Sequence, residues 1–97
     1  MNLDTLRSRY RDAILAIAAK HKADNVRVFG SVARGDVGPG SDIDLLVHAL
    51  PRCSLLDLCA IQNAISDLTG GLPVDVIADD EIRPELAPYI LREAVPL

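Results

Sequence analysis

Three aspartates stand in apolar runs of the sequence, where the interior of a strand is expected to be hydrophobic. Asp42 and Asp44 lie in SDIDLLV, and Asp75 lies in PVDVI. Side chains alternate across a strand, so Asp42 and Asp44 share one face while the neighbouring apolar residues share the other. Carboxylates gathered at one spot repel one another unless a proton is held at a raised pKa or a cation lies between them. The sequence therefore predicts a metal site made of Asp42, Asp44 and Asp75.

The ligand types indicate which metal this site would hold. Oxygen ligands without histidine or cysteine favour Mg²⁺, with Mn²⁺ as an alternative, over zinc. Two such ions can stabilise the attacking and the leaving oxygen of an in-line displacement at phosphorus. The simpler interpretation is that Asp42 caps a turn and the other carboxylates are solvated on an edge strand, because short motifs also arise by chance. The residues before the aspartates favour the metal site.

A Gly-Ser pair precedes the aspartates, at the end of the previous predicted strand, and is suited to bind phosphate. Gly30 lets backbone amides approach an anion closely, and amides at the start of a short helical turn favour negative charge. Ser31 can add a hydroxyl donor, and Arg34 can neutralise phosphate charge as pyrophosphate leaves. Alone, Gly-Ser is a common turn and an arginine is a surface residue. Together with the aspartates, these residues predict a nucleotide site.

The predicted elements bring these residues to one place. The second and third strands are joined by a helix, which suits parallel neighbours, and the first strand is expected to run antiparallel to the second. All three aspartates then fall at one end of the sheet, beside the Gly-Ser pair. The elements predicted from periodicity and turn residues are a helix at 3–21, a strand at 25–30, a helical turn at 31–34, a turn at 38–41, a strand at 42–50, a helix at 54–69, a strand at 73–78 and a helix at 85–94.

Composition limits the function classes. The chain has 97 residues and a net charge of −4, so we expect one domain, residues 1–97, without the basic face of a protein that grips nucleic acid over a broad surface. No apolar run approaches the ~20 residues of a membrane span, and the N-terminus lacks a signal-peptide pattern. Cys53 and Cys59 lack CxxC spacing, and we expect them to be buried thiols in a reducing cytoplasm.

Two other polar segments are expected to lie outside the site. His48 shares a strand face with Asp44 but is expected about 13 Å from it, too far to act on the substrate. Residues 79–81 (DDE) are expected to cap the last helix.

The residues quoted above resemble a known family. The pattern GSVARGD, then SDIDLLV, then the aspartate of PVDVI, is similar to that of the minimal nucleotidyltransferases of the DNA polymerase beta superfamily, and the similarity covers nearly the whole chain. It implies an α/β (α+β) nucleotidyltransferase fold, with a small mixed β-sheet and helices packed mainly on one face. It also implies Mg²⁺-dependent transfer of a nucleoside monophosphate, with ATP as the expected substrate.

The resemblance implies a role for each residue. Asp42 and Asp44 would bind both metal ions, and Asp75 would bind the catalytic ion and help to activate the acceptor hydroxyl. The phosphates of the nucleotide would be held by Gly30, Ser31, Arg34 and Ser41.

The resemblance also implies a partner. Small prokaryotic members of the family are often paired with a HEPN-domain protein that resembles an RNase toxin, and in some pairs they transfer AMP to its tyrosine. This implies an antitoxin that modifies a hydroxyl of a HEPN toxin and can form an oligomer with it. We expect the chain to have a nucleotide site and no second domain for an acceptor, which would agree with a protein acceptor. Two alternatives stay open: a binding module that neutralises its toxin by masking it, and transfer to a small molecule.

Overall fold

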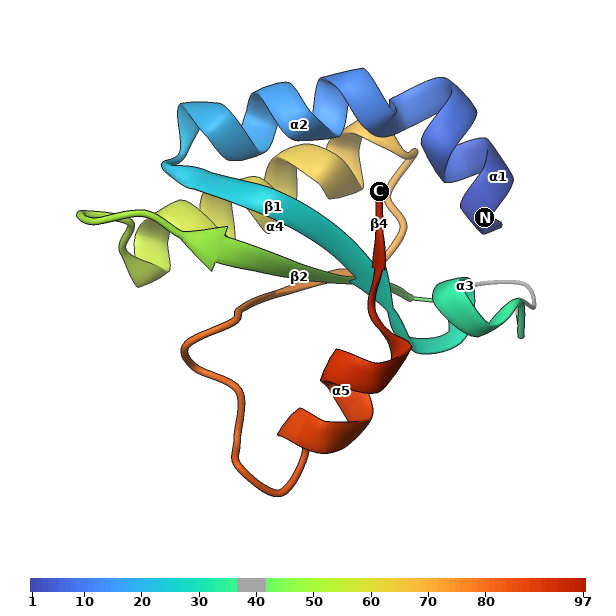
Figure 1. The fold of residues 1–97 in the computed structure, drawn as a ribbon. Helices are drawn as coiled ribbons and strands as arrows, with labels where there is room; N and C mark the ends of the chain where they lie inside the picture. Colours follow the sequence, from blue (N-terminus) through green and yellow to red (C-terminus); the bar gives the residue numbers. More distant parts are fainter. Residues whose placement is uncertain (37–41) are drawn as a thin grey trace.

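The computed structural model describes residues 1–36 and 42–97, which contain a four-stranded sheet of order β3-β2-β1-β4 (Figure 1). β2 and β3 are parallel, whereas β1 runs antiparallel to both β2 and β4. The sheet is therefore mixed, and the predicted pairing of the first three strands is confirmed. The predicted turn at 38–41 and the predicted phosphate ligand Ser41 lie outside the described residues. The strands are β1 (Ala23–Phe29), β2 (Ile43–Ala49), β3 (Val74–Ala78) and β4 (Val95–Pro96).

The connection between β2 and β3 explains why these strands are parallel. It contains α4 (Leu55–Leu68), which begins at a capping box. The Asp57 N–H donates to Ser54 Oγ at 3.3 Å, and the Ser54 N–H donates to the Asp57 carboxylate at 2.9 Å. A helix of this length carries the chain back along the sheet, so β3 starts at the same end as β2.

Two helices cover one face of the sheet. α2 (Arg11–Lys20) and α4 lie side by side over it in Figure 1. Their apolar side chains form one core with Ile43, Leu45 and Val47 of β2, which are fully buried. Because side chains alternate along a strand, Asp44 lies on the opposite face. The predicted fold class, a small mixed sheet with helices mainly on one face, is confirmed.

The first predicted helix, 3–21, is present but not uniform. α1 (Leu3–Thr5) is followed by a π-helical segment, η1 (Leu6–Tyr10), and then by α2. A single π-helical segment changes the register of an α-helix without breaking it. Apolar periodicity therefore predicts the helix but not this local change.

The remaining elements lie away from the covered face. α3 (Gly30–Arg34) follows β1 directly, and α5 (Ala87–Glu93) lies on the side of the sheet opposite α2 and α4 (Figure 1). After α5 the chain returns to the edge of β1 as β4. The two-residue β4 was not predicted, because so short a strand has no alternation of its own.

Two expectations about polar residues are wrong. α5 begins at Ala87 without a side-chain cap, so residues 79–81 do not cap it. Asp79 follows β3 directly and instead accepts a hydrogen bond from Arg27 Nη2 at 2.9 Å. Cys53 is only partly buried and Cys59 is exposed, both as free thiols. Cys59 falls on the outer side of α4, because Leu58, Ile61 and Ile65 form its buried face.

The described residues also include no helix whose length and apolar composition would let it cross a lipid bilayer.

Candidate active site

The pairing of strands brings the predicted site residues to one end of the sheet. In the register of the sheet, Asp44 of β2 is opposite Asp75 of β3 on one side and opposite Phe29 of β1 on the other. Gly30, the first residue of α3, therefore lies beside Asp44, at the place where β1 ends. Asp42 comes one residue before β2. The predicted meeting of these elements at one end is what the structure shows.

Asp44 is partly buried and has the other two aspartates close enough to act on its charge. Its partial burial raises the pKa of the carboxyl above its usual value, and the negative charges of Asp75 and then Asp42 raise it further. The Arg34 guanidinium acts in the opposite direction, while Glu93 adds a smaller increase in the pKa. The local field at Asp44 is therefore negative, and added positive charge would stabilise this end of the sheet.

Asp42, Asp44 and Asp75 are the residues predicted to bind the metal. The described residues contain no group of three carboxylate, histidine or cysteine side chains arranged to hold a metal ion. Asp42 and Asp75 are exposed, and their side chains interact with Asp44 through charge. The donor types fit a hard divalent cation, because all three offer carboxylate oxygens and their repulsion would be relieved by positive charge. The metal site stays a prediction on this chemistry.

Gly30 cannot be replaced by a larger residue without disturbing Asp44. Its φ is +74°, in the left-handed region that disfavours other residues. A Cβ added at this position would overlap Asp44 Oδ2. The glycine thus lets the start of α3 pack directly on the carboxylate.

A cavity of about 450 Å³ lies at this end of the sheet. It is lined by part of the predicted site, and Asp75 is not among the lining residues. It is also lined by residues of β1 and α5, and by the residue before α5, that the sequence analysis did not identify. The predicted residues are Gly30, Ser31, Arg34, Asp42 and Asp44. The residues that were missed are Phe29, Leu86, Tyr89, Ile90 and Glu93.

Glu93 makes the most specific contacts of the residues that were missed. The Gly30 N–H donates to Glu93 Oε1 at 2.6 Å, and Arg34 Nη1 donates to the same oxygen at 2.8 Å. The hydrogen bond to Glu93 is the largest cause that raises the pKa of Arg34, so the guanidinium stays charged. No spacing in the sequence connects residue 93 with residues 30 and 34, because only the return of the chain through α5 brings them together.

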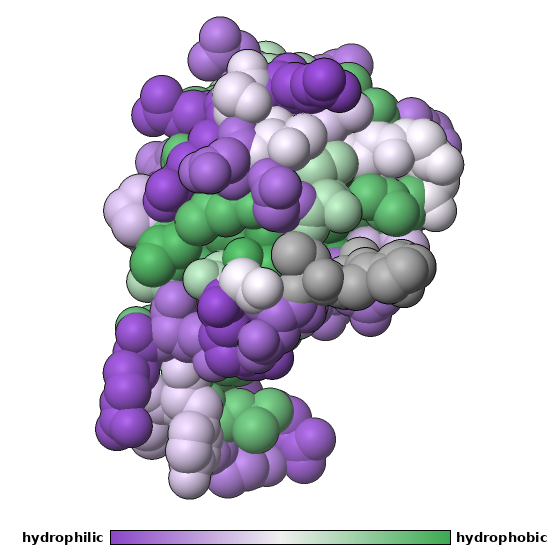
Figure 2. All heavy atoms as spheres, turned by 90° about the vertical axis from the view of Figure 1, so that its right-hand side faces the viewer, coloured by the Kyte–Doolittle hydropathy of each residue, from purple (hydrophilic) through white to green (hydrophobic). Residues whose placement is uncertain are grey.

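α5 adds apolar surface beside the cavity. Leu86, Tyr89 and Leu91 are exposed. In Figure 2 the lower lobe, which contains α5, is largely hydrophilic and carries a small apolar patch. The cavity therefore has a polar wall from the sheet and α3 and a partly apolar wall from α5.

Comparison with known proteins identifies the family. The sequence pattern of the family described as nucleotidyltransferase domain matches residues 11–97. The chain belongs to the nucleotidyltransferase family. The nucleotidyltransferase is 36% identical over 95 residues to a provisionally named protein adenylyltransferase of Methanocaldococcus jannaschii. The aligned region covers 98% of this chain and 97% of the relative. It is 34% identical over 70 residues to the protein adenylyltransferase MntA of Thermococcus cleftensis, covering 72% of this chain and 70% of the relative.

Solved structures support the same family. A structure described as a candidate minimal nucleotidyltransferase has 45% sequence identity and a TM-score of 0.84. The match covers 100% of this chain and 97% of the chain in that structure. A crystal structure of a toxin-antitoxin with AMP-PNP has 17% sequence identity and a TM-score of 0.74, which shows the shared fold. The match covers 88% of this chain and 69% of the chain in that structure. The nucleotidyltransferase is thus an enzyme of the transferase class.

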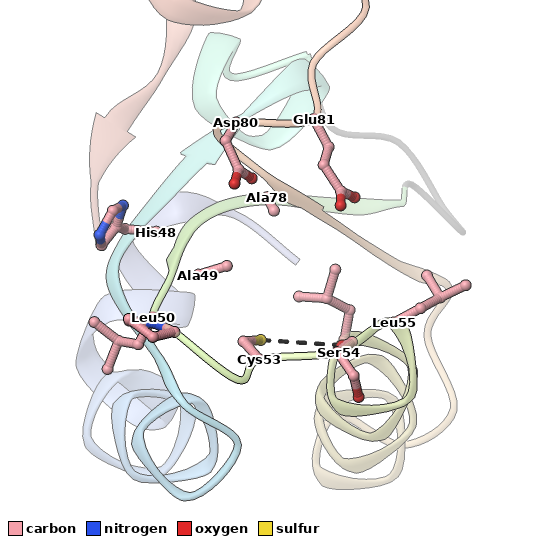
Figure 3. Close-up of a pocket in the computed structure, with 11 residues that line it drawn as sticks. His48, Ala49, Leu50, Cys53, Ser54, Leu55, Ala78, Asp80 and Glu81 are labelled. Atoms are coloured by element: carbon pink, nitrogen blue, oxygen red, sulfur yellow. Dashed lines mark hydrogen bonds between the residues drawn. The ribbon is translucent and has the colours of Figure 1, made fainter.

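A second cavity of the nucleotidyltransferase, of about 430 Å³, lies at the other end of β2 (Figure 3). Leu50, Leu55 and Asp80 are among its lining residues, and so is His48, which does not line the cavity beside Asp44. Among the residues that the structure describes, none of the predicted nucleotide or metal ligands lines it. Five of the predicted ligands, Gly30, Ser31, Arg34, Asp42 and Asp44, line the cavity beside Asp44 instead.

Proposed function

We propose that this nucleotidyltransferase transfers AMP from ATP to a hydroxyl of a HEPN-family toxin, with a tyrosine as the acceptor, and acts as the antitoxin of the pair. The observation that carries the proposal is the register that sets Asp44 beside Asp75, with Gly30 packed on Asp44. The names of the relatives, which are protein adenylyltransferases, support a protein as the acceptor. The toxin-antitoxin neighbour with AMP-PNP supports a toxin partner and a nucleotide substrate.

In this proposal the phosphates of ATP lie against the start of α3. The Gly30 amide and the Ser31 hydroxyl would donate to phosphate oxygens, and the charged Arg34 would pair with the β- and γ-phosphates. Ser41 is proposed as a further phosphate ligand. Phosphate oxygens accept hydrogen bonds from the same donors as carboxylates do, which agrees with the contacts that Glu93 makes with Gly30 and Arg34.

The three carboxylates are proposed to bind the metal ions and to activate the acceptor hydroxyl. Asp42, Asp44 and Asp75 would hold two Mg²⁺ ions, or Mn²⁺, whose positive charge would be supplied to the phosphate oxygens. Asp75 is proposed to accept the proton of the acceptor hydroxyl. The acceptor oxygen then bonds to the α-phosphorus, the bond from this phosphorus to the bridging oxygen breaks, and pyrophosphate leaves.

We place the acceptor on a separate protein and treat residues 1–97 as one minimal domain. Leu86 and Tyr89, which are exposed and line the cavity, offer apolar surface on which a protein partner could bury its own residues. We further propose that the pair works in the cytoplasm, where Cys53 and Cys59 would stay reduced.

Label transfer tests the proposal. The protein is incubated with Mg²⁺, ATP labelled at the α-phosphate and the HEPN-family protein encoded next to it. The partner should become labelled on a tyrosine, and Asp42→Asn should abolish the label. An unlabelled partner, or equal labelling with Asp42→Asn, would contradict transfer. If Asp75→Asn still neutralised the toxin fully, masking would explain the antitoxin instead.

A further inference from the structure

Glu93 occupies the donors that the proposed function assigns to phosphate. Its Oε1 accepts from the Gly30 N–H at 2.6 Å and from Arg34 Nη1 at 2.8 Å. These are two of the groups expected to hold the triphosphate. Both bonds end on a single carboxylate oxygen, so the carboxylate stands where a phosphate oxygen would be bound.

The ion pair is accessible enough to be exchanged. The Arg34 side chain is 50% exposed and that of Glu93 is 28% exposed. Both residues line the cavity beside Asp44, so a ligand in that cavity can reach the donors. A buried pair would be expected to act as a fixed structural element, whereas an exposed pair contributes little to stability and can open.

We propose that Glu93 competes with phosphate for the Gly30 amide and Arg34 and so controls the affinity of the site for phosphate ligands. This inference depends on the proposed function, because it takes those two groups as phosphate donors. A ligand that reaches them must displace the carboxylate, so its affinity is lowered by the fraction of molecules in which Glu93 is bound. Ligands with several negative oxygens and a bound cation displace it best, and the carboxylate can return to the donors after pyrophosphate leaves.

The competition predicts tighter binding when the negative charge of Glu93 is removed. Glu93→Gln keeps the size of the side chain, and its amide oxygen accepts more weakly than a carboxylate does. We expect Glu93→Gln to bind Mg²⁺–ATP and Mg²⁺–pyrophosphate about fivefold more tightly than the wild type, the effect of one exposed charge pair. Glu85→Gln is the matched control, since Glu85 pairs with Arg83 at 3.0 Å between exposed side chains. It should leave both affinities unchanged.

Two further readouts separate competition from a structural role. In the Arg34→Ala background, Glu93→Gln should change affinity by less than it does alone, because the shared donor is gone. The amide resonance of Gly30 should shift in Glu93→Gln without ligand, and in the wild type when pyrophosphate is added. A residue that only fixed α5 in place would weaken binding when changed, and its loss would appear in the melting temperature.

Isothermal titration calorimetry of the full chain decides between the outcomes. Tighter binding of both ligands by Glu93→Gln supports the competition. If the wild type binds both ligands and Glu93→Gln binds them equally or more weakly, the competition is wrong and the proposed function stands. If neither the wild type nor Glu93→Gln binds either ligand, both the competition and the nucleotide site are overturned.

Discussion

The two ends of β2 hold acidic side chains in opposite electrostatic settings. At the end near α3, Asp44 lies beside Asp75 and Asp42, and its burial and then these charges raise its pKa. At the other end, Asp79 accepts a hydrogen bond from Arg27 at 2.9 Å, and its second oxygen lies 3.4 Å from His48 Nδ1. At the end near His48, the carboxylate of Asp79 is paired with basic side chains of the same sheet. At the end near α3, three carboxylates lie close enough to repel one another.

The difference indicates which end serves the fold and which serves a ligand. A carboxylate paired within the chain stabilises the native state without outside help. Carboxylates that repel one another lower stability, and such arrangements are typical of sites where a ligand supplies the missing charge. Gly30 lies at the end near α3, in contact with Asp44. Its φ of +74° and this contact leave no room for a side chain.

The largest expected effect is on activity and separates the two ends. Asp75→Asn should reduce label transfer to the partner by about 10³-fold, the scale for loss of a group that acts on the transition state. Asp79→Asn is the matched control, and its rate per folded molecule should stay within about twofold of the wild type, while its stability falls by about 1 kcal/mol because Arg27 loses its partner. A similar loss of transfer in Asp75→Asn and Asp79→Asn would contradict the different roles of the two ends of β2.

The next effect is on stability and compares two glycines, Gly30 at the start of α3 and Gly35 directly after its end. Gly30 and Gly35 both have positive φ, of 74° and 81°. A Cβ at Gly35 meets nothing within 4 Å, so Gly35→Ala should cost only the backbone strain, about 1 kcal/mol. Gly30→Ala adds the overlap with Asp44 and should be destabilised by about a further 1–3 kcal/mol. Urea unfolding measures both, and equal destabilisation would show that the contact with Asp44 does not matter.

Much of this arrangement could be predicted from local sequence, and the rest could not for a physical reason. Alternation and turn residues predicted the strands that carry Asp44 and Asp75, and the helix between them predicted the parallel register. The helical turn predicted at 31–34 corresponds to α3, and Gly35 ends it with positive φ. Glu93 and Tyr89 were missed because α5 approaches the site only through tertiary packing. Residues 79–81 were misassigned because acidic residues before a helix resemble caps, whereas Asp79 pairs with Arg27 across the sheet.

The smallest expected effect is the pH dependence of stability caused by Asp44. Its pKa is raised in the folded state, so the folded state holds the proton more tightly than the unfolded state does. Stability is therefore lost as pH rises from the unfolded value of about 3.9 through the raised folded value, and the loss persists above it. Asp44→Asn should melt roughly 4 °C above the wild type at neutral pH, the equivalent of at most about 1 kcal/mol.

The difference between Asp44→Asn and the wild type should disappear as the pH falls well below about 3.9, where Asp44 is protonated in both the folded and the unfolded state. Added Mg²⁺ is the control, because it should raise the melting temperature of the wild type more than that of the variant. Melting curves across the pH range measure both effects. A variant that is less stable at neutral pH would show that the Asp44 charge is already compensated within the chain.

The proposed transfer requires that the carboxylates beside Gly30 bind divalent cations together with a nucleotide. Crystals grown with Mn²⁺ and a non-hydrolysable ATP analogue test it directly, because manganese is located by its anomalous scattering. Manganese is expected between Asp42, Asp44 and Asp75, with phosphate oxygens on the Gly30 amide. Manganese only elsewhere, or the nucleotide in the cavity beside His48, would contradict it.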